Sequence, residues 1–168
     1  MTLGPLLAAP APENNYQAAF VARVADAFVR VTGKNLITEA TLDPMALGKS
    51  AWAGDFALLT HRGDERATLN YGNRFALGLW EMDWSSFIAT PSGDTAPHNA
   101  STARDLLMEK VSKDNFVTGY EGERISRSGR RFLIEDVTVW RLLDEQGQSF
   151  GMAAFFRRFR YLAPPPME

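Results

Sequence analysis

Apolar residues in the first part of the chain recur every three or four positions. Within segment 15–32 they are Tyr16, Phe20, Val24, Phe28 and Val31. This spacing predicts an amphipathic helix, and Gly33 is a natural point for it to end. Asp43 followed by Pro44 has the pattern of a helix cap and a first helical residue, which predicts a second, short helix near 44–50. An apolar stripe of this length has to be covered by another part of the fold or by a partner.

The pattern changes near residue 56, where two short runs of strand-forming residues flank a polar turn. Segments 56–61 (FALLTH) and 66–71 (RATLNY) therefore predict a β-hairpin. Helical spacing returns in 73–82 (NRFALGLWEM). Asp83 is then placed to cap a further short helix, so a run of short helices is expected to follow the hairpin.

A longer helix is predicted over 100–113, after a loop that is dense in Pro, Gly, Asp and Asn. Asn99 and Ser101 are the candidate caps for its start. Its apolar residues are Ala103, Leu106, Leu107 and Val111. These residues are expected to share one side of the helix, which would face the rest of the fold.

The remainder of the chain is rich in strand-forming residues. Three strands are predicted between Phe116 and Leu162, separated by turns at Gly129 and Gly147, where a positive φ is commonly required. Consecutive antiparallel strands of this kind form a meander. The order of two strands, several helices and three strands predicts an α+β fold with helices on one side of an antiparallel sheet.

The composition narrows the class of protein. A chain of 168 residues has the length of about one domain. No apolar run approaches the roughly 18 residues of a membrane span, and the start of the chain lacks the pattern of a secretory signal, so we expect a cytoplasmic protein. With no cysteine, the chain cannot form disulfides or a cysteine nucleophile. Its net charge of −2 gives no general reason to bind nucleic acid or an anionic membrane.

Two motifs in the β-rich part resemble those of PAS domains: Gly-x-x-Phe at 129–132, opening the fourth strand, and an acidic turn ending in glycine at 144–147. Two longer blocks, 69–92 and 124–147, resemble the bacterial members of the MEKHLA family, which is related to PAS domains. The resemblance covers roughly 15–160. Its most specific parts are Asn70 to Arg74 in the first block and Ser128 to Trp140 in the second.

This resemblance implies a PAS-like, five-stranded antiparallel sheet with helices on one face, preceded by an N-terminal amphipathic helix. We expect a disordered tail over 1–14, a helical extension over 15–54, the PAS-like domain over 55–162 and a proline-rich tail over 163–168. The family implies a sensory or regulatory module that binds a small ligand, a protein partner or both, without its own output domain. It implies no particular catalytic reaction.

PAS domains often keep a cavity between the sheet and the helices, which makes pocket residues the main candidates for function. The candidate ligand-binding residues are Asn70, Asn73, Arg74, Trp80, Trp84, Met108, Asp136, Trp140 and Phe155. Phe156 belongs to the same aromatic set. Each has a structural alternative: the aromatic residues can be core, Asn70 and Asn73 can cap the next helix, and Arg74 can pair with Glu135 or Asp136.

The resemblance to PAS domains also raises the question of cofactors. Flavin-binding photosensory members use a reactive cysteine and amide side chains from the last strands, and this sequence has neither in place. Haem-binding members usually take an axial histidine from the long helix, whereas His61 ends a strand, His98 precedes that helix and Met108 lies on it. We therefore expect neither haem nor flavin, and two isolated histidines do not make a metal site.

Three further hypotheses concern partners and catalysis. The helix residues Tyr16, Phe20, Val24 and Phe28 are candidates for a homodimer interface. The arginines Arg157, Arg158 and Arg160 alternate with aromatic residues, but we interpret them as a solvated rim, not a nucleic-acid site. The alternative function is a small acid/base enzyme of the isomerase or dehydratase type, which would use Asp136 or Glu135 with His61.

Glu135 and Asp136 stand side by side in the most apolar strand. In an uninterrupted strand they point to opposite faces of the sheet. Asp136 would then share a face with Phe132, Ile134, Thr138 and Trp140, and Glu135 with Leu133, Val137 and Val139. Both faces are apolar, so both are predicted to be covered, and the acids cannot act as a pair unless a bulge intervenes.

Overall fold

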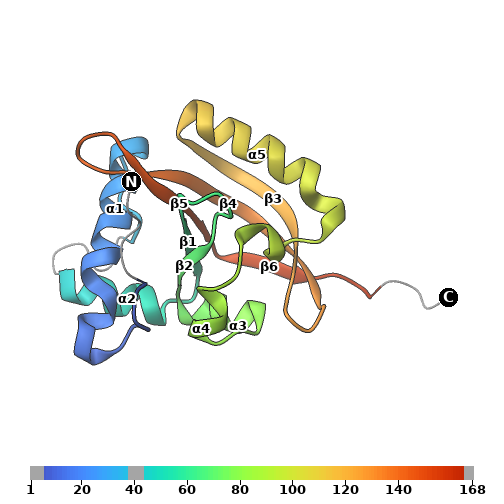
Figure 1. Cartoon of the computed structure of the whole chain (residues 1–168), viewed down its shortest axis with the longest axis horizontal. Coiled ribbons are helices and arrows are strands. Elements are labelled where there is room, and N and C mark those ends of the chain that lie inside the picture. The colour runs from blue at the N-terminus through green and yellow to red at the C-terminus, as the bar shows by residue number, and fades with distance from the viewer. Residues whose placement is uncertain (1–5, 38–43, 165–168) are drawn as a thin grey trace.

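The computed structural model describes residues 6–37 and 44–164 of the chain (Figure 1). A 3₁₀ helix, η1 (Pro12–Gln17), leads into α1 (Ala18–Thr32), and α2 (Pro44–Ala53) follows. The hairpin β1 (Ala57–Arg62) and β2 (Leu69–Gly72) comes next. The short helices α3 (Arg74–Trp80) and α4 (Trp84–Phe87), the turns η3 (Ser92–Thr95) and η4 (His98–Ala100), and the longer α5 (Ser101–Asp114) lie between this hairpin and the remaining strands.

The strands form one antiparallel sheet in the order β2-β1-β5-β4-β3. Its long members are β3 (Phe116–Ile125), β4 (Arg131–Leu143) and β5 (Ser149–Phe156). A short strand, β6 (Arg158–Tyr161), continues β5 after a break at Arg157 and pairs with the first half of β4. The predicted α+β architecture is therefore confirmed, except that the last predicted strand is divided into β5 and β6.

Helices cover both faces of the sheet, and each face has its own core (Figure 1). On one face, α3 and α5 contribute Leu79, Trp80, Leu107 and Val111 to a cluster with the sheet. On the other face, α1 and α2 form the second cluster with the sheet. The short helix α4 bridges the two, because Phe87 belongs to the first cluster and Trp84 packs against the second.

The apolar stripe of α1 is covered by the chain's own sheet. Val24 and Phe28 are buried there, and the ring of Phe28 meets that of Trp140 edge to face, with centroids 4.9 Å apart. Gly33 ends the helix with a φ of 74°, as predicted. Because Val24 and Phe28 are already used inside the chain, they cannot form the predicted homodimer interface while α1 stays on the sheet, and this part of the prediction needs correction. Tyr16 and Phe20 are half-buried.

The helix ends agree with the sequence in part. Asn73 and Asp83 cap α3 and α4 by accepting hydrogen bonds from Ala76 N and Ser86 N, as predicted. Asn70 is not a cap, since its amide oxygen accepts a hydrogen bond from the Thr60 hydroxyl inside the β1–β2 hairpin. The N-cap position of α5 is Ala100, which provides no side-chain cap, so the predicted cap position at Asn99 or Ser101 is wrong. The predicted cap Asp43 lies outside the described residues.

The helix α5 is less deeply packed than its apolar residues suggest. Among its described side chains only Leu107 and Val111 are buried, whereas Ala103 is exposed and Leu106 is 58% exposed. The apolar residues of α5 thus divide between two sides of the helix. No helix among the described residues is long and apolar enough to cross a membrane.

A pair of compensating bulges changes the predicted faces of β4. One extra residue enters β3 between Val117 and Tyr120, and one enters β4 between Ile134 and Val137, where Asp136 has a φ of 52°. Aspartate tolerates this left-handed conformation better than most residues. The alternation therefore shifts by one residue: Phe132, Ile134, Val137 and Val139 all face the first cluster, and Trp140 and Leu142 face the second. The prediction that Trp140 shares a face with Phe132 is wrong.

Part of the predicted disordered tail is placed against the domain. Pro10 is buried, and the indole N–H of Trp84 donates a hydrogen bond to the Leu7 carbonyl at 3.0 Å. The side chains of Asn14 and Gln17 donate hydrogen bonds to the carbonyls of Ala9 and Ala8. Residues 6–14 thus contact the α1 and α4 region, and residues 1–5 lie outside the described part of the chain.

Candidate ligand-binding site

A cavity of about 70 Å³ lies between the sheet and α5, on the face that α1 does not cover. Its walls come from both strands of the hairpin, from α3, α5 and η3, and from all three long strands. Most of the lining is apolar. The apolar lining residues are Leu59, Leu69, Trp80, Leu107, Met108, Ile134, Val137, Val139, Met152, Ala153, Ala154 and Phe156. The polar lining residues are Thr60, His61, Ser92, Thr95, Arg104, Tyr120 and Arg124.

Two arginines give this cavity a positive end. Arg104 comes from α5, is half-buried, and donates to the Ser92 hydroxyl at 2.6 Å. Arg124 comes from β3, is only 9% exposed, and donates to the Glu123 carbonyl at 2.7 Å. Neither guanidinium forms an ion pair with a described residue, and no carboxylate stands among the residues that line the cavity. Two positive charges, one buried and one half-buried, therefore share one region without an ion pair to a described carboxylate.

The electrostatics of Arg104 reflect this arrangement. Burial lowers its pKa below the ordinary value, and the positive charge of Arg124 lowers it further. Asp105 and Tyr120 act in the opposite direction, but their influence is smaller than that of Arg124. The two guanidiniums are thus close enough to repel each other, which costs free energy unless an anion neutralises them.

His61 provides a third polar group at the same cavity. Its Nδ1 lies 3.0 Å from the Arg62 carbonyl, and since a carbonyl only accepts, Nδ1 must carry the proton. Burial lowers the pKa of His61, and the nearby charge of Arg104 lowers it as well, so the neutral ring is favoured. Its Nε2 atom is buried without a hydrogen-bond partner in the described chain. Neutral His61 therefore presents an unsatisfied acceptor in the cavity wall.

The structure brings only some of the predicted ligand-binding residues to this cavity. Trp80 and Met108 line it, as does Phe156 from the same aromatic set. Trp140 and Phe155 face the opposite side of the sheet and pack in the α1 cluster, and Trp84 packs there too. The predicted aromatic set is thus divided between the two faces, because the bulge in β4 reverses the direction in which Trp140 points.

Asn73 has a structural role that its burial makes clear. The side chain is 0% exposed and makes four hydrogen bonds. Its oxygen accepts from Leu58 N and Ala76 N, each at 3.1 Å, and its nitrogen donates to Ala51 O at 2.9 Å and Phe56 O at 2.7 Å. One amide thus joins α2, the start of β1 and the start of α3, and no hydrogen-bonding capacity remains for a ligand.

The predicted pairing of Arg74 with an acid of β4 is wrong. Arg74 is exposed on α3 and forms no ion pair with either acid. Glu135 lies 3.5 Å from Arg160, and Asp136 lies 3.9 Å from Arg158, so both acids pair with arginines of β6. Neither acid lines the cavity that contains His61. The acid/base arrangement required by the alternative enzyme hypothesis is therefore not assembled, and that alternative is not favoured.

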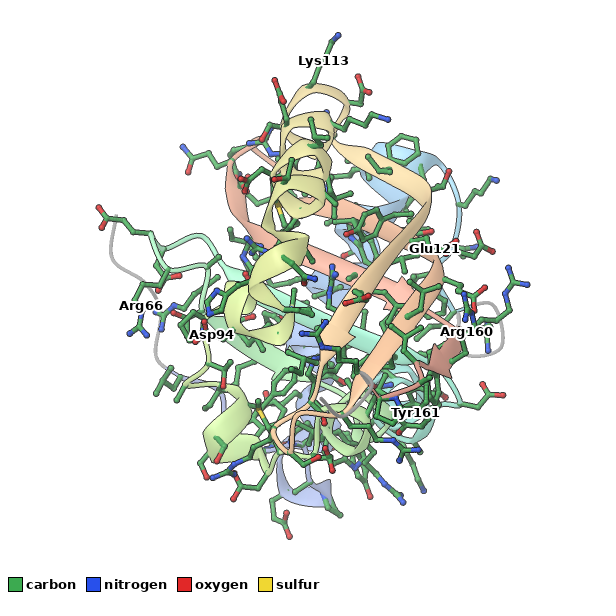
Figure 2. The ribbon with its side chains drawn as sticks, turned by 90° about the vertical axis from the view of Figure 1, so that its right-hand side faces the viewer. Arg66, Asp94, Lys113, Glu121, Arg160 and Tyr161 are labelled. Carbon is green, nitrogen blue, oxygen red and sulfur yellow. The ribbon has the colours of Figure 1, made fainter. Side chains whose placement is uncertain are left out.

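The arginines of the last strands lie at the rim of the sheet. Arg157 pairs with Asp55 at 2.9 Å, and the other two pair with the acids of β4. Figure 2 shows Arg160 and Tyr161 together at the outer edge formed by β6. The described residues contain no group of three or more His, Asp or Glu side chains that could hold a metal ion.

The residues that give the cavity its charge were not predicted from the sequence. Arg104 lies three residues before Leu107 and seven before Val111, on the buried side of α5. A charged residue that falls in line with the apolar positions of a helix indicates a charge on the buried side, and this pattern could have identified Arg104 as a candidate. Arg124 has no comparable signal, because its strand also carries the charged residues Glu121 and Glu123.

The cavity does not fit the cofactors of photosensory or haem-binding PAS proteins. A cavity of about 70 Å³ is smaller than the roughly 150 Å³ that admits a single benzene ring, and both flavin and haem are larger than benzene. The sequence also has no cysteine that could react with a flavin.

Comparison with solved structures identifies the fold. A PAS domain from Colwellia psychrerythraea has a TM-score of 0.55 and 16% identity, over 68% of this chain and 92% of that one. An RNA-binding Light-Oxygen-Voltage receptor has a TM-score of 0.59 and 14% identity, over 73% of this chain and 34% of that one. The PAS domain of a LuxR-family transcriptional regulator from Burkholderia thailandensis, in complex with ethanol, has a TM-score of 0.51 and 12% identity, over 64% and 92%.

A search of curated proteins finds no match. The sequence does match the family model of the MEKHLA domain over residues 18–161, which is most of the chain and includes α1 as well as the sheet. The strand order, the helices between β2 and β3, and this match agree with the resemblance seen in the two sequence blocks. The chain therefore belongs to the MEKHLA domain family and has a PAS-type fold.

Proposed function

We propose that this protein is a sensory module whose cavity between the sheet and α5 binds a small molecule. The observation that carries the proposal is a mostly apolar cavity with three polar groups: Arg104 and Arg124, which form no ion pair with a described carboxylate, and His61, whose buried Nε2 has no described hydrogen-bond partner. Such a combination is typical of a ligand site, in which a few placed polar groups set specificity. The similar structure with bound ethanol is a PAS domain in complex with a molecule of this size range.

The packing of α5 suggests how binding could be transmitted. Only Leu107 and Val111 among its described side chains are buried, so this helix rests on the sheet through a small apolar contact. A ligand in the cavity contacts Arg104, Leu107 or Met108 on the sheet-facing side of α5, and so adds contacts that this helix otherwise lacks. Because a ligand shifts an equilibrium by its differential affinity for two states, binding favours the docked position of α5.

A protein partner would detect this change on the outer side of α5 and β3. Figure 2 looks onto this surface, with Lys113 at the end of α5 and Glu121 on β3. The groove between the two elements includes the exposed Leu106 beside Ala103 and Val117. Ordering of α5 would fix the shape of this groove, which is how the sensory function would reach a partner.

The test of ligand binding is a titration followed by amide NMR with a panel of small alcohols, acids, amides and amines. Native mass spectrometry of gently purified protein would detect a retained ligand beforehand. Binding in the cavity should be abolished by Ala154→Leu, which fills the cavity from β5, and preserved by Ala103→Leu on the exposed side of α5. If no compound binds, or if binding ignores Ala154→Leu, the proposed function is wrong.

A further inference from the structure

The charges that line the cavity restrict the kind of ligand it can take. Arg104 comes from α5 and Arg124 from β3, and neither forms an ion pair with a described carboxylate. A buried charge without a partner is costly, and a ligand that supplies the opposite charge recovers that free energy. A cation would add to the existing repulsion, and a neutral molecule would leave it unchanged. The cavity therefore favours an anion.

Arginine is also specific about the shape of the anion. A planar guanidinium donates pairs of parallel hydrogen bonds, which match a carboxylate. Arg104 already donates one hydrogen bond to Ser92, and Arg124 donates one to the Glu123 carbonyl, so each keeps further N–H groups for a ligand. The Tyr120 hydroxyl lies 3.5 Å from an Arg124 nitrogen and belongs to the same end of the cavity.

His61 adds a second requirement. Its proton is on Nδ1, and its Nε2 is a buried acceptor without a partner in the described chain. A carboxylate oxygen cannot satisfy a neutral Nε2, because both atoms are acceptors. The ligand must therefore carry a hydrogen-bond donor in addition to its negative charge, and a hydroxyl group is the smallest neutral donor that the polar wall of β1 can accommodate.

The size of the cavity sets the third requirement. Its volume of about 70 Å³ is less than half of the roughly 150 Å³ that admits benzene. The lining beyond the polar groups is apolar, with Met108 and Met152 as the adaptable side chains. A molecule with two or three carbon atoms satisfies both conditions.

From these three requirements we propose that the cavity binds a short-chain hydroxycarboxylate, with its carboxylate on Arg104 and Arg124 and its hydroxyl donating to His61 Nε2. The chemical class is that of glycolate and lactate. This inference rests on the proposed function, because it names the ligand of the same cavity.

The experiment compares four three-carbon probes that differ in one group at a time: lactate, propionate, 1,2-propanediol and 1-amino-2-propanol. Binding is measured by amide NMR titration of the full chain. Lactate should bind most tightly. Propionate lacks the hydroxyl and 1,2-propanediol lacks the charge, so both should bind more weakly, and the cationic 1-amino-2-propanol should not bind in the cavity.

Variants assign the contacts. Arg104→Met and Arg124→Met should each weaken lactate binding about 10- to 100-fold, the usual effect of losing a hydrogen bond to a charged group, and should leave 1,2-propanediol unchanged. Arg127→Met is the matched control, because it removes the same charge from an exposed arginine outside the cavity. His61→Phe should remove the preference for lactate over propionate while propionate binding persists.

Specific results would overturn the proposal. If 1,2-propanediol binds as tightly as lactate, or Arg127→Met weakens lactate as much as Arg104→Met, the anion inference is wrong although the cavity remains a ligand site. If propionate and lactate bind equally, the role of His61 is wrong. If none of the four probes binds in a manner sensitive to Ala154→Leu, the whole inference is wrong, and the panel described above decides separately whether the cavity binds any small molecule.

Discussion

The two faces of the sheet differ in the charge of their polar groups: those under α1 and α2 are neutral, whereas those under α5 include charged arginines. Under α1 and α2, the aromatic rings of Phe28, Tyr71 and Trp140 fill the space, and the Tyr71 hydroxyl and Trp140 indole N–H are buried without a partner in the described chain. Both groups are neutral. Burial raises the pKa of the Tyr71 hydroxyl well above its ordinary value, so this hydroxyl stays protonated and uncharged. Under α5, the polar groups at the cavity include two guanidiniums that form no ion pair with a described carboxylate.

This difference shows how one sheet can serve stability on one side and recognition on the other. A neutral unsatisfied group costs about 1 to 3 kcal/mol and can be absorbed by dense packing around it. A buried charge costs more and makes the empty site unfavourable, so it creates a reason for a ligand to bind. The α1 face is therefore expected to respond to mutation through stability alone, and the α5 face through both stability and binding.

The largest effect is expected at Asn73, which connects the two helical layers. Asn73→Ala removes four hydrogen bonds and leaves buried backbone groups of Leu58 and Phe56 without partners, which should lower the free energy of unfolding by about 4 kcal/mol. Urea denaturation measures this. The control is Asn70→Ala, where a single side-chain hydrogen bond to Thr60 is lost and about 1 kcal/mol is expected. Similar losses for the two variants would contradict the special role of Asn73.

The next effect concerns the α1 face. Phe28→Ala should lower the free energy of unfolding by about 3 kcal/mol, because it opens a cavity against Trp140. Ligand affinity in the other cavity should not change. Val29→Ala, at the neighbouring position that is 42% exposed, should change stability by less than about 0.5 kcal/mol. A change of ligand affinity in folded Phe28→Ala would show that the two faces are not independent.

On the α5 face, Leu107→Ala should cost about 2 kcal/mol, since the side chain already borders a cavity and loses fewer contacts than one in dense core. The enlarged cavity should also admit ligands longer than those of the unmodified protein. Leu106→Ala, one residue earlier and exposed, should alter neither stability nor ligand length. Calorimetry with acids of increasing chain length measures both, and equal effects of the two substitutions would contradict the assigned orientation of α5.

The bulge that separates the faces can be tested at Asp136. Asp136→Val should destabilise by about 1 to 2 kcal/mol, because a β-branched residue is strained at a φ of 52°. Asp136→Asn tolerates the same backbone and removes only the exposed pair with Arg158, so a change below about 0.5 kcal/mol is expected. If the Asn variant were as unstable as the Val variant, Asp136 would contribute to stability through its charge and not through its tolerance of the left-handed backbone.

The smallest effect is a pH dependence from His61. Burial lowers its pKa in the folded state, so the unfolded chain binds the additional proton more readily as pH falls through the ordinary value of about 6.5. The stability that neutral His61 provides is thus present above that pH and is lost below it. His61→Gln should reduce the fall in urea midpoint between neutral and acidic pH, because it removes this titrating group. An unchanged slope in His61→Gln would contradict this assignment.

Local patterns are sufficient to predict most of the elements, because helix spacing, caps and turn glycines act within a few residues. Gly33, Asn73 and Gly129 each have the role that their neighbours indicate. The bulge at Asp136 escapes prediction because the strict alternation of a strand leaves no place for an inserted residue. The sequence does carry a trace of it, since apolar residues at 132 and 134 are followed by others at 137 and 139, a shift of one position.

The candidate site is harder to predict because it depends on residues distant in sequence. Trp80 and Met108 can be assigned to a cavity from the resemblance to PAS domains. Arg104 and Arg124 matter because no described carboxylate lines the cavity beside them. The sequence cannot show this, because it depends on how α5 and β3 pack against the sheet. Glu135 and Asp136, the most conspicuous charges in the sequence, instead pair with arginines of the next strand.

The amide of Asn73 has a mechanical consequence. It is attached at once to Ala51 of α2, to the first residues of β1 and to the start of α3. A displacement of α3, which borders the cavity, would therefore be transmitted to α2 on the other face of the sheet through the hydrogen bonds of this single side chain. Slower hydrogen exchange in α2 upon ligand binding would record that force, at a distance from any atom the ligand touches.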